Sequence, residues 1–198
     1  MFKWQNEIEI KNKHKFISYL GYNRDWWNYY SQYKNAIDEL VNGIEKNIPI
    51  DTISLPLLFM IRHSIEIGLK ANILKLQEVN PKVEKIILGG NKSHSNEILY
   101  NKFEEHLISI IDNFQIRATI IKEINEYLEK FKPLKSKLHK LDKGSFNFRY
   151  PVDRKGNYNF EWDKKENIAE IVNLYYEIQP FLIFTDRVLY EEGVFGFE

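Results

Sequence analysis

The sequence contains no cysteine among its 198 residues. This absence excludes a disulfide framework, a thiolate zinc site and a cysteine nucleophile, and it is compatible with a reducing compartment. An excess of charge of one sign is also lacking, because 28 basic residues balance 28 acidic ones. A nucleic acid or an anionic membrane would therefore have to be attracted by a local basic patch, since the whole chain offers no net field.

Long uninterrupted apolar runs are missing as well. Asp, Glu, Lys or Arg interrupts every apolar stretch before it reaches the length that spans a bilayer, and residues 1–7 are too polar for a signal peptide. We therefore expect a cytoplasmic protein with no membrane partner.

The residues that are present predict one helical domain covering 1–198. Hydrophobic residues make up 43% of the chain, enough to bury a core, and they recur at steps of three and four. The expected fold class is all-α, an up-and-down bundle of four to five main helices. The expected helices are 24–46, a helix from Ser54 to about 77, one capped by Ser93 or Ser95 and reaching about 111, one at about 114–131, and one at 164–190 with a kink at Pro180.

Two segments depart from this helical pattern. Residues 132–143 form a short lysine-rich amphipathic stretch that begins at Lys132-Pro133. In 145–162 aromatic residues alternate with polar ones on both sides of a turn at 154–157, which predicts a β-hairpin or an extended aromatic flap before the last helix.

The helix expected at 54–77 is apolar almost all round, yet it carries four polar groups. Arg62, Glu66 and Lys70 are four residues apart and share one stripe, and His63 precedes Glu66 by three residues. A buried charge without a partner is costly, so these groups either pair with one another or open onto a cleft or a partner chain. In the first interpretation Arg62–Glu66 and Glu66–Lys70 are intrahelical ion pairs and His63 is a core histidine. In the second, they are a candidate catalytic site.

Two further residues are candidates for the same site. His94 lies at the expected start of the third helix, where backbone N–H groups favour an anion. Arg149 lies on the polar side of the aromatic segment, where its guanidinium suits a phosphate, a stacked base or a buried pair with Glu66.

A run of lysines forms the one clear basic patch. Lys135, Lys137 and Lys140 belong to it, and Tyr150 follows in the aromatic segment as a potential stacking platform. Such a run is either a solvated face or a contact for nucleic-acid phosphates, and in the second case these four residues would bind RNA.

Other kinds of site lack their signals. The five histidines show no HExxH or paired spacing for zinc, and Gly89-Gly90 lacks the Gly-Lys-Ser/Thr ending of a phosphate loop. We therefore expect no metal and no cofactor, and we expect His14 and His106 to be ordinary surface residues.

The string Arg62-His63, Glu66, Lys70 resembles the corresponding helix of HEPN-like helical proteins from prokaryotic defence and toxin–antitoxin loci. His94 matches a downstream histidine at a helix start, and Phe148-Arg149-Tyr150-Pro151 with Asp153 and Gly156 matches a second string of that family. The resemblance implies a bundle that is frequently dimeric, in a superfamily known for metal-independent RNA cleavage. The usual nuclease spacing, Arg-x4–6-His, is absent, because His63 directly follows Arg62.

Two functions remain open from the sequence. One is an RNA-directed effector, a metal-independent endoribonuclease of antiviral defence or a toxin–antitoxin system, acting as a homodimer through Arg62, His63, Glu66, Lys70, His94 and Arg149. The other is a non-catalytic dimerisation module that binds an antitoxin or another defence protein.

Overall fold

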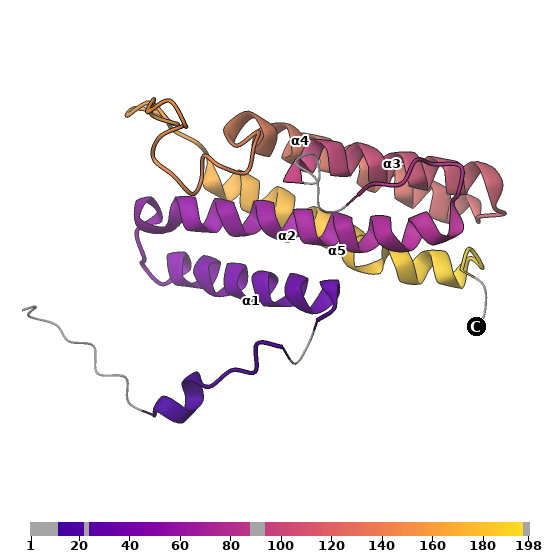
Figure 1. Cartoon of the computed structure of the whole chain (residues 1–198), viewed down its shortest axis with the longest axis horizontal. Coiled ribbons are helices and arrows are strands. Elements are labelled where there is room, and N and C mark those ends of the chain that lie inside the picture. Colours follow the sequence, from indigo (N-terminus) through magenta and orange to yellow (C-terminus); the bar gives the residue numbers. More distant parts are fainter. Residues whose placement is uncertain (1–11, 22–23, 88–93, 196–198) are drawn as a thin grey trace, which may run out of the picture.

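The computed structural model describes residues 12–21, 24–87 and 94–195, and all regular structure in these ranges is helical. The predicted all-α bundle is confirmed (Figure 1). Three features of the sequence, the polar start at 1–7, the alternative cap Ser93 and the pair Gly89-Gly90, lie outside the described residues. The elements are η1 (Lys13–Phe16), α1 (Trp26–Glu45), α2 (Ile50–Val79), α3 (Asn96–Asn113), α4 (Ala118–Leu141) and α5 (Ile168–Glu191).

Helix α2 is the central element, since it packs against α1, α3 and α5, while α4 packs against α3 and α5 (Figure 1). Its burial explains its composition: an apolar surface on nearly every side is stable only where neighbours cover it. By length and composition α2 could cross a membrane, but 56% of its apolar window is buried inside the bundle. The structure is therefore consistent with a soluble protein.

Helix α3 runs in the same direction as α2, so the expected up-and-down order does not hold between these two helices. At its start, Asn96 donates through Nδ2 to the carbonyl of Arg62 at 2.9 Å. Near its end, Ser109 donates to Oδ1 of Asn80 at 3.1 Å. This arrangement places the beginning of α3 beside the middle of α2, and it brings His94 to the polar stripe.

Helix α2 begins one turn earlier than predicted, so Ser54 is not its cap. The helix starts after Pro49, and the hydroxyl of Thr52 donates to the carbonyl of Pro49 at 2.7 Å. Pro56 consequently lies inside the helix. At the start of α3 the predicted cap Ser95 does accept the N–H of Ile98.

Helix α4 continues through Pro133, so the lysine-rich stretch is not a separate element. Phe131, Leu134, Leu138 and Leu141 keep one apolar face buried along its second half. Pro133 is exposed and lies on the other side, where a carbonyl that loses its N–H partner can be solvated. A continuous buried face thus outweighs the helix-breaking tendency of this proline.

The segment between α4 and α5 contains no strand, so the hairpin form of the prediction was wrong. The N–H groups of Arg149 and Tyr150 both donate to the carbonyl of Phe146, which folds this part into a turn. A single bridge joins Val152 and Tyr158. Two short strands without a third partner are only marginally stable in water, so aromatic alternation alone did not produce a ladder here.

Candidate functional site

The site centres on the carboxylate of Glu66, which is buried in the middle of α2. Nζ of Lys70 donates to Oε1 at 2.7 Å, and Nδ1 of His94 lies 2.9 Å from the same oxygen. On the other oxygen, Arg62 donates at 3.2 Å and Nδ1 of His63 lies 3.9 Å away. Four nitrogen-bearing side chains, from α2 and from the start of α3, therefore lie within ion-pair distance of one carboxylate.

Arg62 connects this carboxylate to two other parts of the bundle. Its guanidinium is buried, and it also donates to the carbonyl of His94. Its Nε lies 3.6 Å from Oδ2 of Asp142, the residue that follows α4. Burial lowers the pKa of Arg62, whereas the charges of Asp142 and Glu66 raise it. Two anions thus compensate this guanidinium, which stays protonated across the ordinary pH range.

Asp142 is the part of the site that the sequence did not reveal. Its Oδ1 accepts the N–H groups of Phe146 at 2.6 Å and Asn147 at 3.0 Å. The same carboxylate therefore pairs with Arg62 and fixes the turn that carries Arg149. An aspartate before Lys-Gly-Ser signals a loop, and nothing local to it indicates a partner on α2. Below, Arg62, His63, Glu66, Lys70, His94 and Asp142 are called the polar cluster.

His63 and His94 are the members of the polar cluster that reach solvent. Their side chains are 30% and 58% exposed, respectively. His63 lies between two rings, Tyr33 edge-on at 4.7 Å and Phe59 stacked at 5.7 Å between centroids. The interpretation of His63 as a core histidine was therefore wrong, whereas the predicted pairs Arg62–Glu66 and Glu66–Lys70 are both present.

The geometry at Glu66 fixes the tautomer of His94. A carboxylate only accepts hydrogen bonds, so Nδ1 of His94 carries the proton directed at Glu66. In the neutral ring, Nε2 then has a free lone pair. Burial by itself would raise the pKa of Glu66, but interactions with His63, Lys70 and His94 lower this pKa to about 2. The carboxylate is therefore an anion throughout the neutral range.

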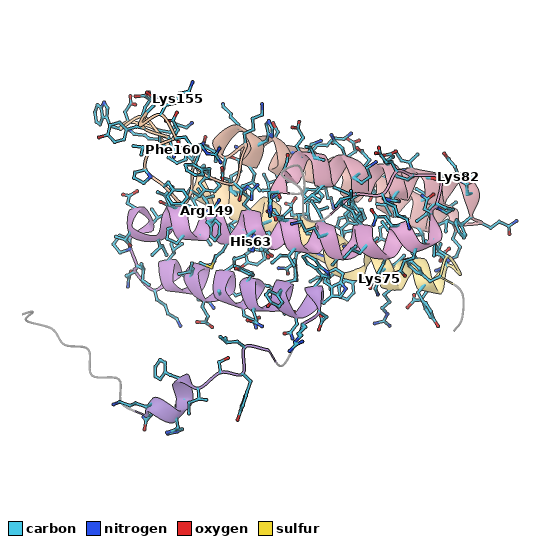
Figure 2. The ribbon with its side chains drawn as sticks, viewed as in Figure 1. His63, Lys75, Lys82, Arg149, Lys155 and Phe160 are labelled. Atoms are coloured by element: carbon cyan, nitrogen blue, oxygen red, sulfur yellow. The ribbon has the colours of Figure 1, made fainter. Side chains whose placement is uncertain are left out.

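Arg149 lies beside the polar cluster and is exposed to solvent. Its Nε donates to the carbonyl of Ser145 at 2.8 Å, and its guanidinium lies over the rings of Phe59 and Tyr150, 5.9 and 5.5 Å from their centroids. In the view of Figure 2, Arg149 lies next to His63. The alternative of a buried Arg149–Glu66 pair was wrong, and the charge of Arg149 acts on Arg62 only by lowering its pKa.

The lysines of α4 are not part of the polar cluster. Nζ of Lys135 lies 4.2 Å from the ring centroid of Tyr100, and Lys137 pairs with Glu170 at 3.0 Å. Lys140 is exposed, and among the described residues no carboxylate lies within ion-pair distance of it. The patch is thus partly engaged within the bundle, and RNA binding by Lys135, Lys137 and Lys140 stays a prediction.

His106 does not lie on the surface, so that prediction was wrong. It is fully buried on α3, and neither ring nitrogen has a hydrogen-bond partner. Burial, with the charge of Lys102, lowers its pKa to about 4. His14, in contrast, is exposed as predicted.

We compared the chain with protein-family models, curated proteins and solved structures. None of them matches. No group of three His, Cys, Asp or Glu side chains suited to a metal ion occurs in the described ranges. Chemically, the polar cluster offers two accessible imidazoles, one hydrogen-bonded to the buried carboxylate of Glu66 and one 3.9 Å from it, with an exposed guanidinium beside them.

Proposed function

We propose that this chain is a metal-independent endoribonuclease, an RNA-directed effector of the HEPN-like kind. The observation that carries the proposal is that two solvent-reaching histidines face the two oxygens of Glu66, with Nδ1 of His94 hydrogen-bonded at 2.9 Å and Nδ1 of His63 at 3.9 Å. Cleavage of RNA without a metal requires a base, an acid and a cation near the phosphate, and His94, His63 and Arg149 have these chemistries.

In the proposed reaction, Nε2 of His94 accepts the proton of a ribose 2′-hydroxyl. The 2′-oxygen attacks the adjacent phosphorus, and the bond from phosphorus to the 5′-oxygen breaks. His63 in its protonated form donates a proton to that leaving oxygen. The products are a 2′,3′-cyclic phosphate and a 5′-hydroxyl, and the two histidines have exchanged their protonation states.

The other members of the polar cluster would act by positioning. Arg62, Glu66 and Lys70 are buried and paired with one another, so they do not present themselves to a phosphate. Their role in the proposal is to keep the carboxylate ionised and in place behind the imidazoles, as second-layer hydrogen bonds do in other acid–base sites. Arg149 is the exposed cation that would contact the phosphate.

The test is incubation of the purified protein with total RNA or tRNA in the presence of EDTA. We expect cleavage to fall by about 10²-fold or more in His63→Ala and in His94→Ala. His14→Ala, which removes an exposed histidine outside the polar cluster, is the matched control and should cleave normally. Absence of cleavage by the wild type, or wild-type rates in His94→Ala, would contradict the proposal.

A second candidate function is a non-catalytic module of a cytoplasmic defence or toxin–antitoxin system that dimerises or binds an antitoxin. The burial and full pairing of Arg62 and Glu66 favour it, because a purely structural network that joins α2, α3 and the end of α4 would have the same contacts. Under this function His63→Ala and His94→Ala would alter dimerisation or partner capture, measured by light scattering, while no RNA is cleaved at any protein concentration.

A further inference from the structure

The segment 150–163 between α4 and α5, called here the aromatic loop, exposes large rings that the bundle does not use. Trp162 is 96% exposed, Tyr158 is 81% exposed and Tyr150 is 48% exposed. Arg154 and Lys155 are exposed in the same loop, and among the described residues neither has a carboxylate within ion-pair distance. Rings interleaved with free cations are the combination that binds unpaired nucleotides, with bases stacked and phosphates neutralised.

The backbone of the loop is held firmly, so these rings are presented by a fixed scaffold. Asp153 accepts the N–H groups of Lys155 at 2.7 Å and Asn157 at 2.9 Å through Oδ1. Gly156 takes the left-handed conformation that closes this turn, with φ of 85°. Asn159 donates from its N–H to the carbonyl of Pro151 at 3.0 Å. A platform that is ordered before binding loses little entropy when a ligand stacks on it.

The aromatic residues of the loop separate into an anchor and two outward rings. Phe160 stacks on Phe148 with 6.2 Å between centroids and packs against the core. Tyr158 and Trp162, two residues before and after it, remain in solvent. Phe160 is therefore the ring of this loop that anchors it to the core. The loop does not need Tyr158 and Trp162 for this packing, so their exposure calls for another explanation.

A continuous series of contacts joins the loop to the candidate site. His63 stacks on Phe59, the guanidinium of Arg149 lies over Phe59, and the same guanidinium lies over Tyr150 at the start of the loop. In the view of Figure 2, Arg149 lies between His63 and the loop that carries Lys155 and Phe160. A strand whose phosphate sits near His63 and Arg149 would therefore continue onto Tyr150.

We infer that the aromatic loop is a binding site for unpaired nucleotides that flank the scissile phosphate, with bases stacking on Tyr158 and Trp162 and phosphates on Arg154 and Lys155. The inference rests on the proposed function, which makes RNA the ligand, and it assigns to that RNA the aromatic loop as a second binding site outside the polar cluster.

The test uses a strand that cannot be cleaved, 2′-O-methyl oligouridine of about 12 nucleotides, with the dissociation constant measured by fluorescence anisotropy. The double variant Tyr158→Ala/Trp162→Ala should raise the dissociation constant about tenfold or more, because each stacked base contributes substantially to affinity. Trp162→Phe in the otherwise unchanged chain should bind nearly as the wild type. Phe184→Ala, which removes a half-exposed ring on α5, is the matched control and should not change binding.

Two more measurements separate the kinds of contact. Arg154→Gln/Lys155→Gln should reduce the salt dependence of binding, whereas the ring variant should leave it unchanged. A self-complementary duplex should not compete with the single strand. Equal dissociation constants for the wild type and the double ring variant would overturn the inference, as would equally strong competition by the duplex.

Failure of this inference is distinguishable from failure of the proposed function. If the non-cleavable strand binds through Trp162 but the wild type cleaves no RNA, the loop assignment stands and the endoribonuclease proposal fails. If His94→Ala abolishes cleavage while the ring variant has unchanged affinity and an unchanged KM, the endoribonuclease stands and the loop assignment is wrong.

Discussion

The buried imidazole of His106 predicts a loss of stability in mild acid. In the unfolded chain this ring takes up a proton near pH 6.5, whereas in the fold its pKa is lowered to about 4 by burial and by the charge of Lys102. Between these values the unfolded chain binds more protons, so the stabilising effect is complete above pH 6.5 and is lost as the pH falls to about 4.

The size of the effect follows from the two pKa values. A pKa of 6.5 in the unfolded chain and about 4 in the fold correspond to about 3 kcal/mol of unfolding free energy, all of it lost below pH 4. At about pH 5 the loss relative to neutral pH is about 2 kcal/mol.

The experiment compares urea unfolding of the wild type and His106→Leu at about pH 7 and pH 5. Leucine fills a similar space and removes two buried nitrogens that lack hydrogen-bond partners, so the variant should be at least as stable at neutral pH. It should lose about 2 kcal/mol less than the wild type on acidification. Equal losses in the two proteins would refute the assignment of His106 as a buried neutral group.

Three further outcomes are expected. Asp142→Ala should lower the unfolding free energy by about 3–5 kcal/mol in chemical denaturation, because it leaves the guanidinium of Arg62 with one fewer buried anion. A loss below about 1 kcal/mol, the size expected for an exposed ion pair, would contradict this prediction. The pKa of Glu66 is lowered from 4.5 to about 2, so its ionisation stabilises the fold fully above pH 4.5 and this stabilisation is lost as the pH falls to about 2. In Glu66→Gln the unfolding free energy should therefore depend less on pH within this window, and within no other part of the pH range. Gly68→Ala should lower the melting temperature, because a Cβ there would lie 3.1 Å from the ring of Tyr30. This overpacking costs more than the higher helix propensity of alanine gains. A higher melting temperature would show that the ring moves aside.

The helical frame and much of the polar cluster could be predicted because their signals are local. Oppositely charged residues four positions apart on an apolar helix indicate ion pairs, whatever that helix packs against. Arg62 and Lys70 do pair with Glu66. His94 was a candidate because it precedes a helix start, and the start of α3 lies against α2.

The rest depended on contacts between distant segments. Asp142 meets Arg62 only because α4 returns along α3, and its local sequence signals no more than a turn. Likewise, alternation in the aromatic segment did not distinguish the anchoring Phe160 from the exposed Trp162, since the identity of the inward ring is set by Phe148. His106 was wrongly placed at the surface, although it shares the buried face of α3 with Phe103, Leu107 and Ile110.

The parallel arrangement of α2 and α3 has a consequence for synthesis of the chain. Helices α1 and α2 can form a hairpin as soon as they emerge, but Glu66 gains His94 only after the start of α3 has been made, and Arg62 gains Asp142 only after α4 has been completed. Contacts of this kind form late, since loop closure precedes them. For a protein proposed to cut RNA, the complete polar cluster would thus be assembled only once α4 has been made.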